Sequence, residues 1–280
     1  MYSNPTWPSR RVGFLFGPEL ISTATLRVGH SVKPAPTSPA DLDARRELAL
    51  WTHELLCAEY GAPFRFFSTK DPLSELISAL LSHRTRNQDS HKAYQQLRAR
   101  FETWDAVRDA PTEEVQEAIS PCTWPEQKAP RLQLVLREVG QRCGGPCNLE
   151  FLADMPIPEA RAWLEALPGV GPKTSAAVLL FSTLRRPAMP VDSHHHRVAQ
   201  RLGLIGPKVG EAAAHAQLEA LLPPGWDAQQ VYDHHEAFMF HGQKCCYFHT
   251  PACGRCVLLE RCPTGLARTA RAPAPALSLF

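Results

Sequence analysis

Hydrophobic positions recur with the period of an α-helix from about residue 41 onwards. Leu48, Trp51 and Leu55 fall on one face of the first such segment, next to the Leu56–Cys57 pair. A second segment is among the most hydrophobic of the chain, and its apolar face consists of Leu73, Leu76, Ile77, Leu80 and Leu81. The pattern therefore predicts two amphipathic helices in this part of the chain.

The second helix also carries a start signal. Asp71 is its expected N-cap and Pro72 its first residue, because an aspartate accepts hydrogen bonds from free N–H groups and proline lacks one. Further helices are predicted, each set off by Pro, Gly or Asp, over residues 89–101, 103–108, 112–119, 127–142, 148–154, 194–203, 209–222 and 227–241. Alternation typical of strands is nearly absent, so the sequence predicts an all-α fold.

Composition limits the class of protein without naming it. The 280 residues suffice for one large or two modest domains, and 44% apolar with 21% charged residues is ordinary for a globular chain. No run of about 18 apolar residues exists, so no membrane span is expected. The first residues lack the basic-then-apolar order of a secretory signal, which predicts a cytoplasmic location. A net charge of +2 gives no evidence for nucleic acid, so any DNA site must be a local patch.

The two ends of the chain differ from its middle. Residues 1–40 hold several prolines and no sustained helical period, which predicts an N-terminal extension. Residues 265–280 form a tail rich in Ala, Pro and Arg, for which we expect disorder.

Cysteines gather near the C-terminus, where five of the nine lie between Cys245 and Cys262. The four cysteines spaced C-x6-C-x2-C-x5-C are Cys246, Cys253, Cys256 and Cys262. Four thiolates in this arrangement can bind a [4Fe–4S] cluster, and a structural zinc ion needs the same ligands. Zinc sites usually have two close pairs, so the spacing favours iron–sulfur. Cys245 could replace Cys246, but the six-residue gap favours Cys246.

The other four cysteines are interpreted as ordinary thiols, with Cys143 and Cys147 a weak metal candidate; they are Cys57, Cys122, Cys143 and Cys147.

A glycine-containing turn joins two predicted helices at residues 164–174, which read LEALPGVGPKT. The first helix is expected to end at Leu167, and Pro172 starts the next. Such a hairpin exposes N–H groups at a helix N-terminus, which suits a phosphate oxygen regardless of DNA sequence. The candidate DNA contacts here are Leu167, Gly169, Val170, Gly171 and Thr174. A plain connector between two helices is the alternative.

Two residues near the hairpin have the chemistry of a catalytic pair. Lys173 stands at the start of the second helix, where the positive helix end favours the neutral, nucleophilic amine. Asp192 follows nineteen residues later in the sequence Val-Asp-Ser-His, and its carboxylate could stabilise positive charge at a sugar C1′ atom. Taken alone, Lys173 could be an ordinary surface lysine, and Asp192 could be an ordinary helix N-cap.

Several motifs together resemble the endonuclease III branch of the helix-hairpin-helix DNA glycosylases. They are LSELISALLS (73–82), QKAPR (127–131), LPGVGPKT (167–174), VDSH (191–194) and the four spaced cysteines. The resemblance covers about residues 41–264. It implies a two-domain fold around a DNA-binding cleft. A six-helix domain would span 65–186, and an iron–sulfur domain would combine 41–64 with 187–264.

The resemblance also implies a function. The chain would be a monomer that removes damaged bases, chiefly oxidised pyrimidines, from double-stranded DNA and then cleaves the abasic site. Lys173 would form a Schiff base at C1′, Asp192 would activate it or stabilise the sugar cation, and β-elimination would nick the strand. The nearest alternative is a monofunctional glycosylase such as the adenine-removing relative, which lacks the hairpin lysine. A different class is a non-catalytic iron–sulfur DNA-binding protein, which would need neither residue.

The remaining candidate DNA contacts follow the LLS sequence. The family commonly places a glutamine there to fill the gap left by a flipped base. In this chain His83 or Arg84 could fill it, and Arg84 and Arg86 could contact phosphate. His194 matches the family position in VDSH. The runs His194–His196 and His234–His235 are interpreted as structural or DNA-facing, because neighbouring helical residues point in different directions.

Overall fold

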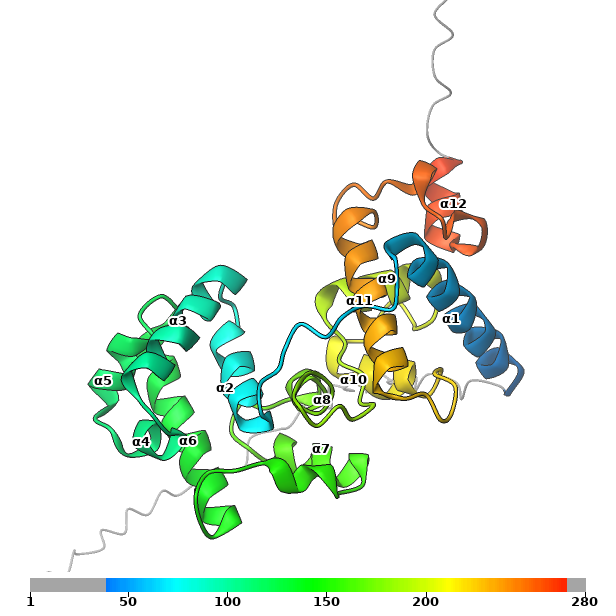
Figure 1. The fold of residues 1–280 in the computed structure, drawn as a ribbon. Helices are drawn as coiled ribbons and strands as arrows, with labels where there is room; N and C mark the ends of the chain where they lie inside the picture. Colours follow the sequence, from blue (N-terminus) through cyan, green and yellow to red (C-terminus); the bar gives the residue numbers. More distant parts are fainter. Residues whose placement is uncertain (1–38, 271–280) are drawn as a thin grey trace, which may run out of the picture. The chain divides into compact units, whose positions relative to one another are not determined.

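The computed structural model describes residues 39–270, and every regular element in this range is helical (Figure 1). No strand occurs within residues 39–270, which confirms the all-α prediction. The predicted extension, residues 1–40, lies outside the described range except for its last two residues, where the first helix begins.

Twelve α-helices and three short 3-10 helices follow one another in this range. The first six are α1 (Pro39–Tyr60), α2 (Pro72–Ser82), α3 (Asn87–Arg100), α4 (Trp104–Asp109), α5 (Thr112–Ala118) and α6 (Pro125–Cys143). The remaining elements are η1 (Glu150–Ala153), α7 (Ile157–Glu165), α8 (Pro172–Phe181), α9 (Ser193–Leu202), α10 (Glu211–Glu219), α11 (Ala228–Lys244), η2 (Cys253–Arg255), η3 (Leu259–Arg261) and α12 (Pro263–Thr269).

Local sequence signals explain where several helices begin. The Asp71 carboxylate accepts a hydrogen bond from the Ser74 N–H at 2.9 Å, and Pro72 is the first residue of α2, as predicted. Asp227 and Gln230 form a reciprocal capping box at the start of α11. The segment predicted as a helix over 148–154 forms only the 3-10 turn η1.

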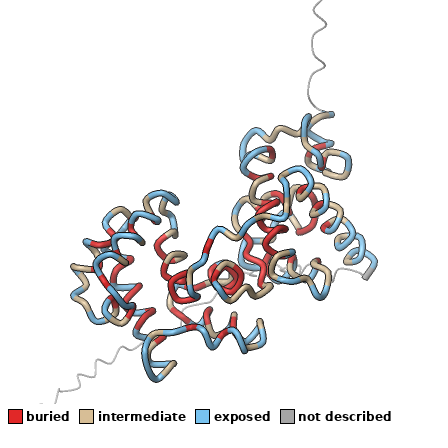
Figure 2. The backbone as a smooth tube through the Cα atoms, in the orientation of Figure 1, coloured by how far each residue is buried: buried red, intermediate tan, exposed pale blue. Residues whose placement is uncertain are grey.

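A first hydrophobic core lies among α2 to α8. Its fully buried side chains are mostly aliphatic, and the largest are Leu73, Leu76, Ile77, Leu81, Leu97, Ile119, Leu132, Leu136 and Leu149. Helix α2 packs against α8 in this core, and both helices are largely buried (Figure 2). The predicted apolar face of α2 is therefore the face that the core uses.

A second core combines an early segment with the C-terminal third of the chain. Helix α1 runs beside α11, which packs on α9 (Figure 1). Its buried residues include Leu56 of α1, Val198 and Leu202 of α9, and Tyr232 and Phe238 of α11. The two cores divide the chain near the predicted domain borders; the borders themselves remain predictions.

The C-terminal tail differs from expectation at its start. Helix α12 includes residues 266–269, for which the composition predicted disorder, so that prediction was wrong there. Pro263 begins this helix, and the Cys262 sulfur accepts a hydrogen bond from the Gly265 N–H at 3.3 Å. Residues 271–280 lie outside the described range. Among the described helices, none is both long and apolar enough to cross a membrane.

Candidate active site and cysteine pocket

The glycine hairpin forms a tight turn between α7 and α8. Gly169 has φ = 80°, a conformation that other residues adopt only with strain, and a β-carbon there would meet the Arg131 side chain at 3.2 Å. The Val170 N–H donates to the Leu167 carbonyl at 3.1 Å. Leu167 and Val170 are buried, so they anchor the turn in the first core and leave Gly169 exposed. Helix α7 ends at Glu165, two residues before the predicted end.

Lys173 is the second residue of α8 and its side chain is exposed. Gly171 is the N-cap, and no side chain caps this end of the helix. The positive end of α8 is therefore open to an anion such as phosphate. Thr174, the next residue, is buried, and its hydroxyl lies 3.2 Å from the His83 Nε2 atom. This contact joins the hairpin to the loop that follows α2.

Asp192 is the N-cap of α9. Its carboxylate accepts a hydrogen bond from the His195 N–H at 2.7 Å, and the residue is half-buried. The preceding Val191 is fully buried, and its N–H donates to the His215 Nε2 atom at 3.0 Å. Packing on one side and capping on the other thus fix the carboxylate at the start of α9.

His235 on α11 is a buried residue whose protonation is influenced by the charges of both Lys173 and Asp192. Its Nδ1 atom donates to the Pro190 carbonyl at 2.9 Å, which leaves Nε2 without a proton in the neutral ring. Burial lowers the pKa of His235, the Asp192 carboxylate opposes this, and the Lys173 ammonium adds to it. Lys173 and Asp192 therefore both lie within electrostatic reach of one buried imidazole.

Glu236, next to His235, is a second acidic group in this region. It is only 7% exposed, and burial raises its pKa to about 7, with the Asp192 and Asp233 carboxylates adding to the effect. Sequence reasoning missed both residues. A glutamate inside an amphipathic helix carries no signal of burial, and the His234–His235 pair was interpreted without a link to Lys173.

The loop after α2 presents the other predicted DNA contacts. The buried Lys128 ammonium donates to the Leu81 carbonyl and to the Thr85 hydroxyl, each at 2.6 Å. These two hydrogen bonds hold the loop against α6. Arg84 has φ = 52° and is exposed, and it makes no hydrogen bond or ion pair with a described residue. Arg86 is also exposed but pairs with Asp89 at 2.7 Å. Arg84 is thus the freer of the two cations.

The three consecutive histidines of α9 have three different environments. The Arg197 Nη2 atom donates to the His194 Nδ1 atom at 3.0 Å. His195 is fully buried, and the Nε2 atom of His196 donates to the Val209 carbonyl at 2.7 Å. The rings do not converge on one point, in keeping with the directions of neighbouring side chains on a helix.

The predicted cluster ligands line one pocket. Cys246, Cys253, Cys256 and Cys262 all face it, together with Cys245 and His241. Arg201 of α9 donates to the Cys246 sulfur at 3.2 Å and to the carbonyls of Tyr247 and Phe248. Burial raises the pKa of the Cys256 thiol to about 12, so the pocket itself does not favour free thiolates.

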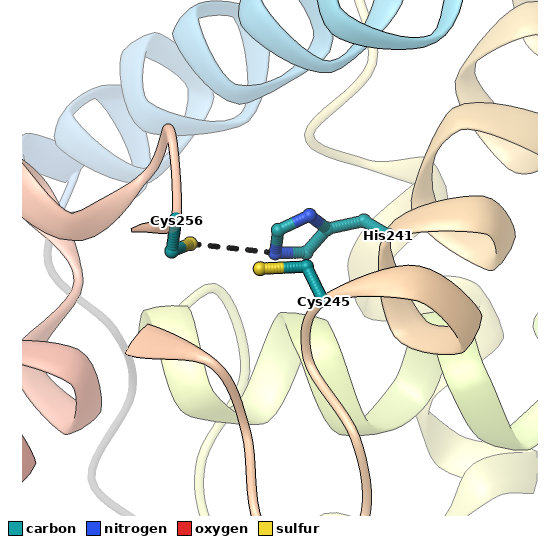
Figure 3. Close-up of side chains that lie close together, drawn as sticks. All are labelled: His241, Cys245 and Cys256. Atoms are coloured by element: carbon teal, nitrogen blue, oxygen red, sulfur yellow. Dashed lines mark hydrogen bonds between the residues drawn. The ribbon is translucent and has the colours of Figure 1, made fainter. Parts of the chain in front are cut away.

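One close group of possible metal donors occurs within the described residues, namely His241, Cys245 and Cys256, whose ligand atoms lie within 4.8 Å of one another (Figure 3). The sequence interpretation named Cys245 as a possible replacement for Cys246 and preferred Cys246 on spacing, and the structure places the Cys245 sulfur within this group of donors. The weak candidate pair Cys143 and Cys147 does not join a metal-like group, since their thiols donate to the carbonyls of Asn148 and Leu136. Cys57 and Cys122 are likewise free thiols outside the pocket.

Comparison with known proteins places this arrangement in a family. Residues 77–224 match the family described as HhH-GPD superfamily base excision DNA repair protein. Endonuclease III of Thermotoga maritima is 31% identical over 193 residues, which is 69% of this chain and 83% of that protein. The chain belongs to the endonuclease III family. It is a base-excision-repair DNA glycosylase, which confirms the resemblance seen in the sequence motifs.

Further relatives agree. Endonuclease III of Escherichia coli K12 is 30% identical over 191 residues, covering 68% of this chain and 83% of the relative. Among solved structures, a trapped endonuclease III–DNA covalent intermediate has a TM-score of 0.66 and 23% identity, covering 80% of this chain and 98% of that one. A thermostable thymine-DNA glycosylase has a TM-score of 0.65 with the same coverage. These two structures support the fold.

Proposed function

We propose that this chain is a bifunctional enzyme that excises a damaged base, chiefly an oxidised pyrimidine, from duplex DNA and then cleaves the strand at the abasic site. The observations that carry the proposal are an exposed lysine, Lys173, at the uncapped start of α8 and a half-buried carboxylate, Asp192, held at the start of α9. A nucleophile and a carboxylate on one site are what Schiff-base chemistry at a sugar carbon requires. A non-catalytic DNA-binding protein would have no need of this pair.

In the first step, the Lys173 amine attacks C1′ while the glycosidic bond breaks and the base leaves with the bonding electrons and a proton. The Asp192 carboxylate stabilises the positive charge that develops on the sugar. Ring opening then gives an imine between Lys173 and C1′. Loss of a C2′ proton expels the 3′ phosphate, and hydrolysis of the imine releases the enzyme.

The hairpin supplies the phosphate contact that positions the strand. The uncapped start of α8, with Gly171 as N-cap, presents N–H groups and a positive dipole end. Gly169 and Gly171 have no side chain that would block a backbone approach. Contacts of this kind set the register of the DNA and are independent of its sequence.

The residue that fills the flipped-base gap is proposed to be Arg84. It is exposed, unpaired within the described residues, and held at the tip of a loop that Lys128 fixes. Extruding a base costs a few kcal/mol, and a side chain that occupies the gap offsets part of that cost. His83 serves less well because its ring contacts Thr174. A guanidinium there could alter lesion preference relative to relatives with glutamine.

Borohydride trapping on duplex DNA with one abasic site tests the central proposal. The wild-type chain should form a covalent adduct, and Lys173→Ala should form none. Lys208→Ala removes an exposed lysine away from the site and should trap as wild type does. An adduct that persists in Lys173→Ala would refute the assignment of Lys173. No adduct with the wild type, while DNA is still bound, would indicate a monofunctional enzyme.

We further propose that Cys246, Cys253, Cys256 and Cys262 hold a [4Fe–4S] cluster, in a chain that acts as a monomer. The donor set fits, because free thiols converge on one pocket and carboxylates are absent from its lining. When bound, the cluster braces η2, η3 and α12 against α9. Analysis for iron and acid-labile sulfide, with absorption near 400 nm, distinguishes it from zinc, which gives neither.

A further inference from the structure

The pocket near the C-terminus contains one more thiol than a four-iron cluster needs. We propose that Cys245 is a reserve ligand, able to bind the cluster iron in place of Cys246. This inference rests on the proposed [4Fe–4S] cluster.

The position of Cys245 supports this role. It is 4% exposed, and its sulfur lies within 4.8 Å of both the Cys256 sulfur and a ring nitrogen of His241 (Figure 3). The thiol makes a contact of 3.7 Å to the Ala252 carbonyl and also interacts with the side chain of Cys256, itself a proposed ligand. A buried thiol beside a carbonyl and a ligand sulfur remains available to a metal.

The backbone fixes this direction of the side chain. The Cys245 N–H donates to the His241 carbonyl at 3.0 Å. The Cys245 carbonyl accepts hydrogen bonds from the N–H groups of Tyr247 at 3.0 Å and Ala252 at 2.9 Å. Cys245 is thus held at the end of α11, facing the pocket, whether or not its thiol binds iron.

Cys246 reaches the same pocket from the next position in the chain. Its carbonyl accepts from Arg197 at 3.0 Å and its sulfur from Arg201 at 3.2 Å. The six-residue spacing to Cys253 and this hydrogen bond to the Cys246 sulfur make Cys246 the primary ligand. Both thiols line the same pocket, so exchange between them involves the side chains of two adjacent residues.

His241 is not the spare donor. Its Nδ1 atom lies 3.0 Å from the Tyr60 hydroxyl, and its Nε2 atom lies 3.6 Å from the Cys256 sulfur. Both ring nitrogens therefore have partners, and the ring braces Cys256. Among the described residues that line the pocket, Cys245 is left as the one thiol beyond the four spaced cysteines.

The exchange needs no oxidant or reductant. The bond between iron and the Cys246 sulfur breaks and a bond to the Cys245 sulfur forms. The proton of the Cys245 thiol passes to the departing Cys246 thiolate. The oxidation state of the cluster is unchanged, and in a Cys246→Ala variant the proton goes to solvent.

The test measures iron and acid-labile sulfide per chain, with electron paramagnetic resonance, on the full chain purified without oxygen. Cys246→Ala should retain most of the wild-type iron, and so should Cys245→Ala. The double variant Cys245→Ala/Cys246→Ala should lose more than half. Cys246→Ser is prepared in parallel as a variant closer in size.

The matched control is Cys262→Ala. Cys262 reaches the pocket from the N-cap of α12, whereas Cys245 lies at the end of α11, so the two thiols enter it from different elements. Cys245 should therefore fail to replace it, and Cys262→Ala should lose iron as the double variant does.

The reserve-ligand proposal would be overturned if Cys246→Ala lost as much iron as Cys262→Ala. It would also be overturned if Cys246→Ala, alone among the variants, failed to accumulate in soluble form. Neither result would contradict the proposed cluster itself. Equal retention of iron by the double variant would overturn the reserve-ligand proposal as well. A wild-type chain without iron and sulfide would instead overturn the proposed cofactor itself.

Discussion

The first core pairs nearly every polar group that it buries, whereas the second core buries histidines without partners. In the first core, the Gln133 amide donates to the carbonyls of Val107 and Ala110 and accepts from Thr112. In the second core, neither ring nitrogen of His195 has a partner, and Nδ1 of His234 has none either. Burial lowers the pKa of both histidines well below the usual 6.5.

This difference has a physical consequence. The first core buries no histidine among the described residues, so its stability should depend less on pH between 5 and 8 than that of the second core. A core that buries neutral histidines and a protonated glutamate loses stability at both ends of that range. Asp192, the proposed catalytic carboxylate, starts helix α9 of the second core, and several residues of the cysteine pocket pack against that core.

The largest expected effect comes from removing a proposed cluster ligand. Cys262→Ala should lower the stability of the second core by more than about 5 kcal/mol, because metal binding and folding are coupled in small cysteine sites. Hydrogen exchange measured by mass spectrometry should show faster exchange in α9, α11 and α12 and unchanged exchange in α2 and α6. Uniformly faster exchange would mean that the two cores unfold as one.

A cavity in the first core should have the next largest effect. Leu76 is fully buried in α2, and Leu76→Ala should cost about 3 kcal/mol of the free energy of unfolding. Since no titrating group is involved, denaturant titrations at pH 5.5 and 8 should give the same loss. A loss that changes by more than about 1 kcal/mol between these pH values would contradict the proposed difference in pH dependence between the two cores.

Removal of His195, whose ring nitrogens have no partner, should reduce the pH dependence of the second core. The folded state binds fewer protons at His195 than the unfolded chain does below the ordinary pKa of 6.5, so stability falls as the pH drops through that value. His195→Leu should raise stability by about 1–2 kcal/mol at pH 7 and by more at pH 5.5.

Thermal unfolding midpoints at both pH values measure this effect. His91 is exposed on α3, and His91→Gln should leave the pH dependence as in the wild type. If the unfolding midpoint of His195→Leu still fell between pH 7 and 5.5 as it does in the wild type, groups other than His195 would cause the loss of stability in acid.

The smallest effect concerns Glu236. Its folded-state pKa of about 7 lies above the ordinary 4.5, so the folded state retains a proton that the unfolded chain has released, and stability falls as pH rises through this window. Glu236→Gln should therefore gain about 1 kcal/mol at pH 8 and nothing at pH 4.5. Glu260→Gln, at an exposed position, should show no gain at either pH.

The same substitution also tests whether Glu236 affects the catalytic region. If the Glu236 carboxylate interacts with Asp192, the pH profile of trapping on abasic DNA should shift in Glu236→Gln, while its value at low pH stays close to that of the wild type. An unchanged profile would restrict Glu236 to a role in stability.

Local sequence patterns were enough to predict the helices, the hairpin and the family. Periodic leucines, the Asp71–Pro72 start and the glycines of the turn are local features whose effect depends on neighbouring residues alone. The spacing of the four cysteines likewise predicted a shared pocket. Hydrogen-bond geometry within a few residues fixes such features, which is why the helix bounds agree within a few residues over most of the described chain.

Which side chains meet across helices depends on tertiary packing. The charges that act on His235, the burial of Glu236 and the position of Cys245 in the cysteine pocket all depend on how α11 packs on α9 and α1. A helical pattern states which face is apolar but not which partner covers it. Burial and the charges of distant neighbours then set the protonation of these groups, and neither is encoded in local spacing.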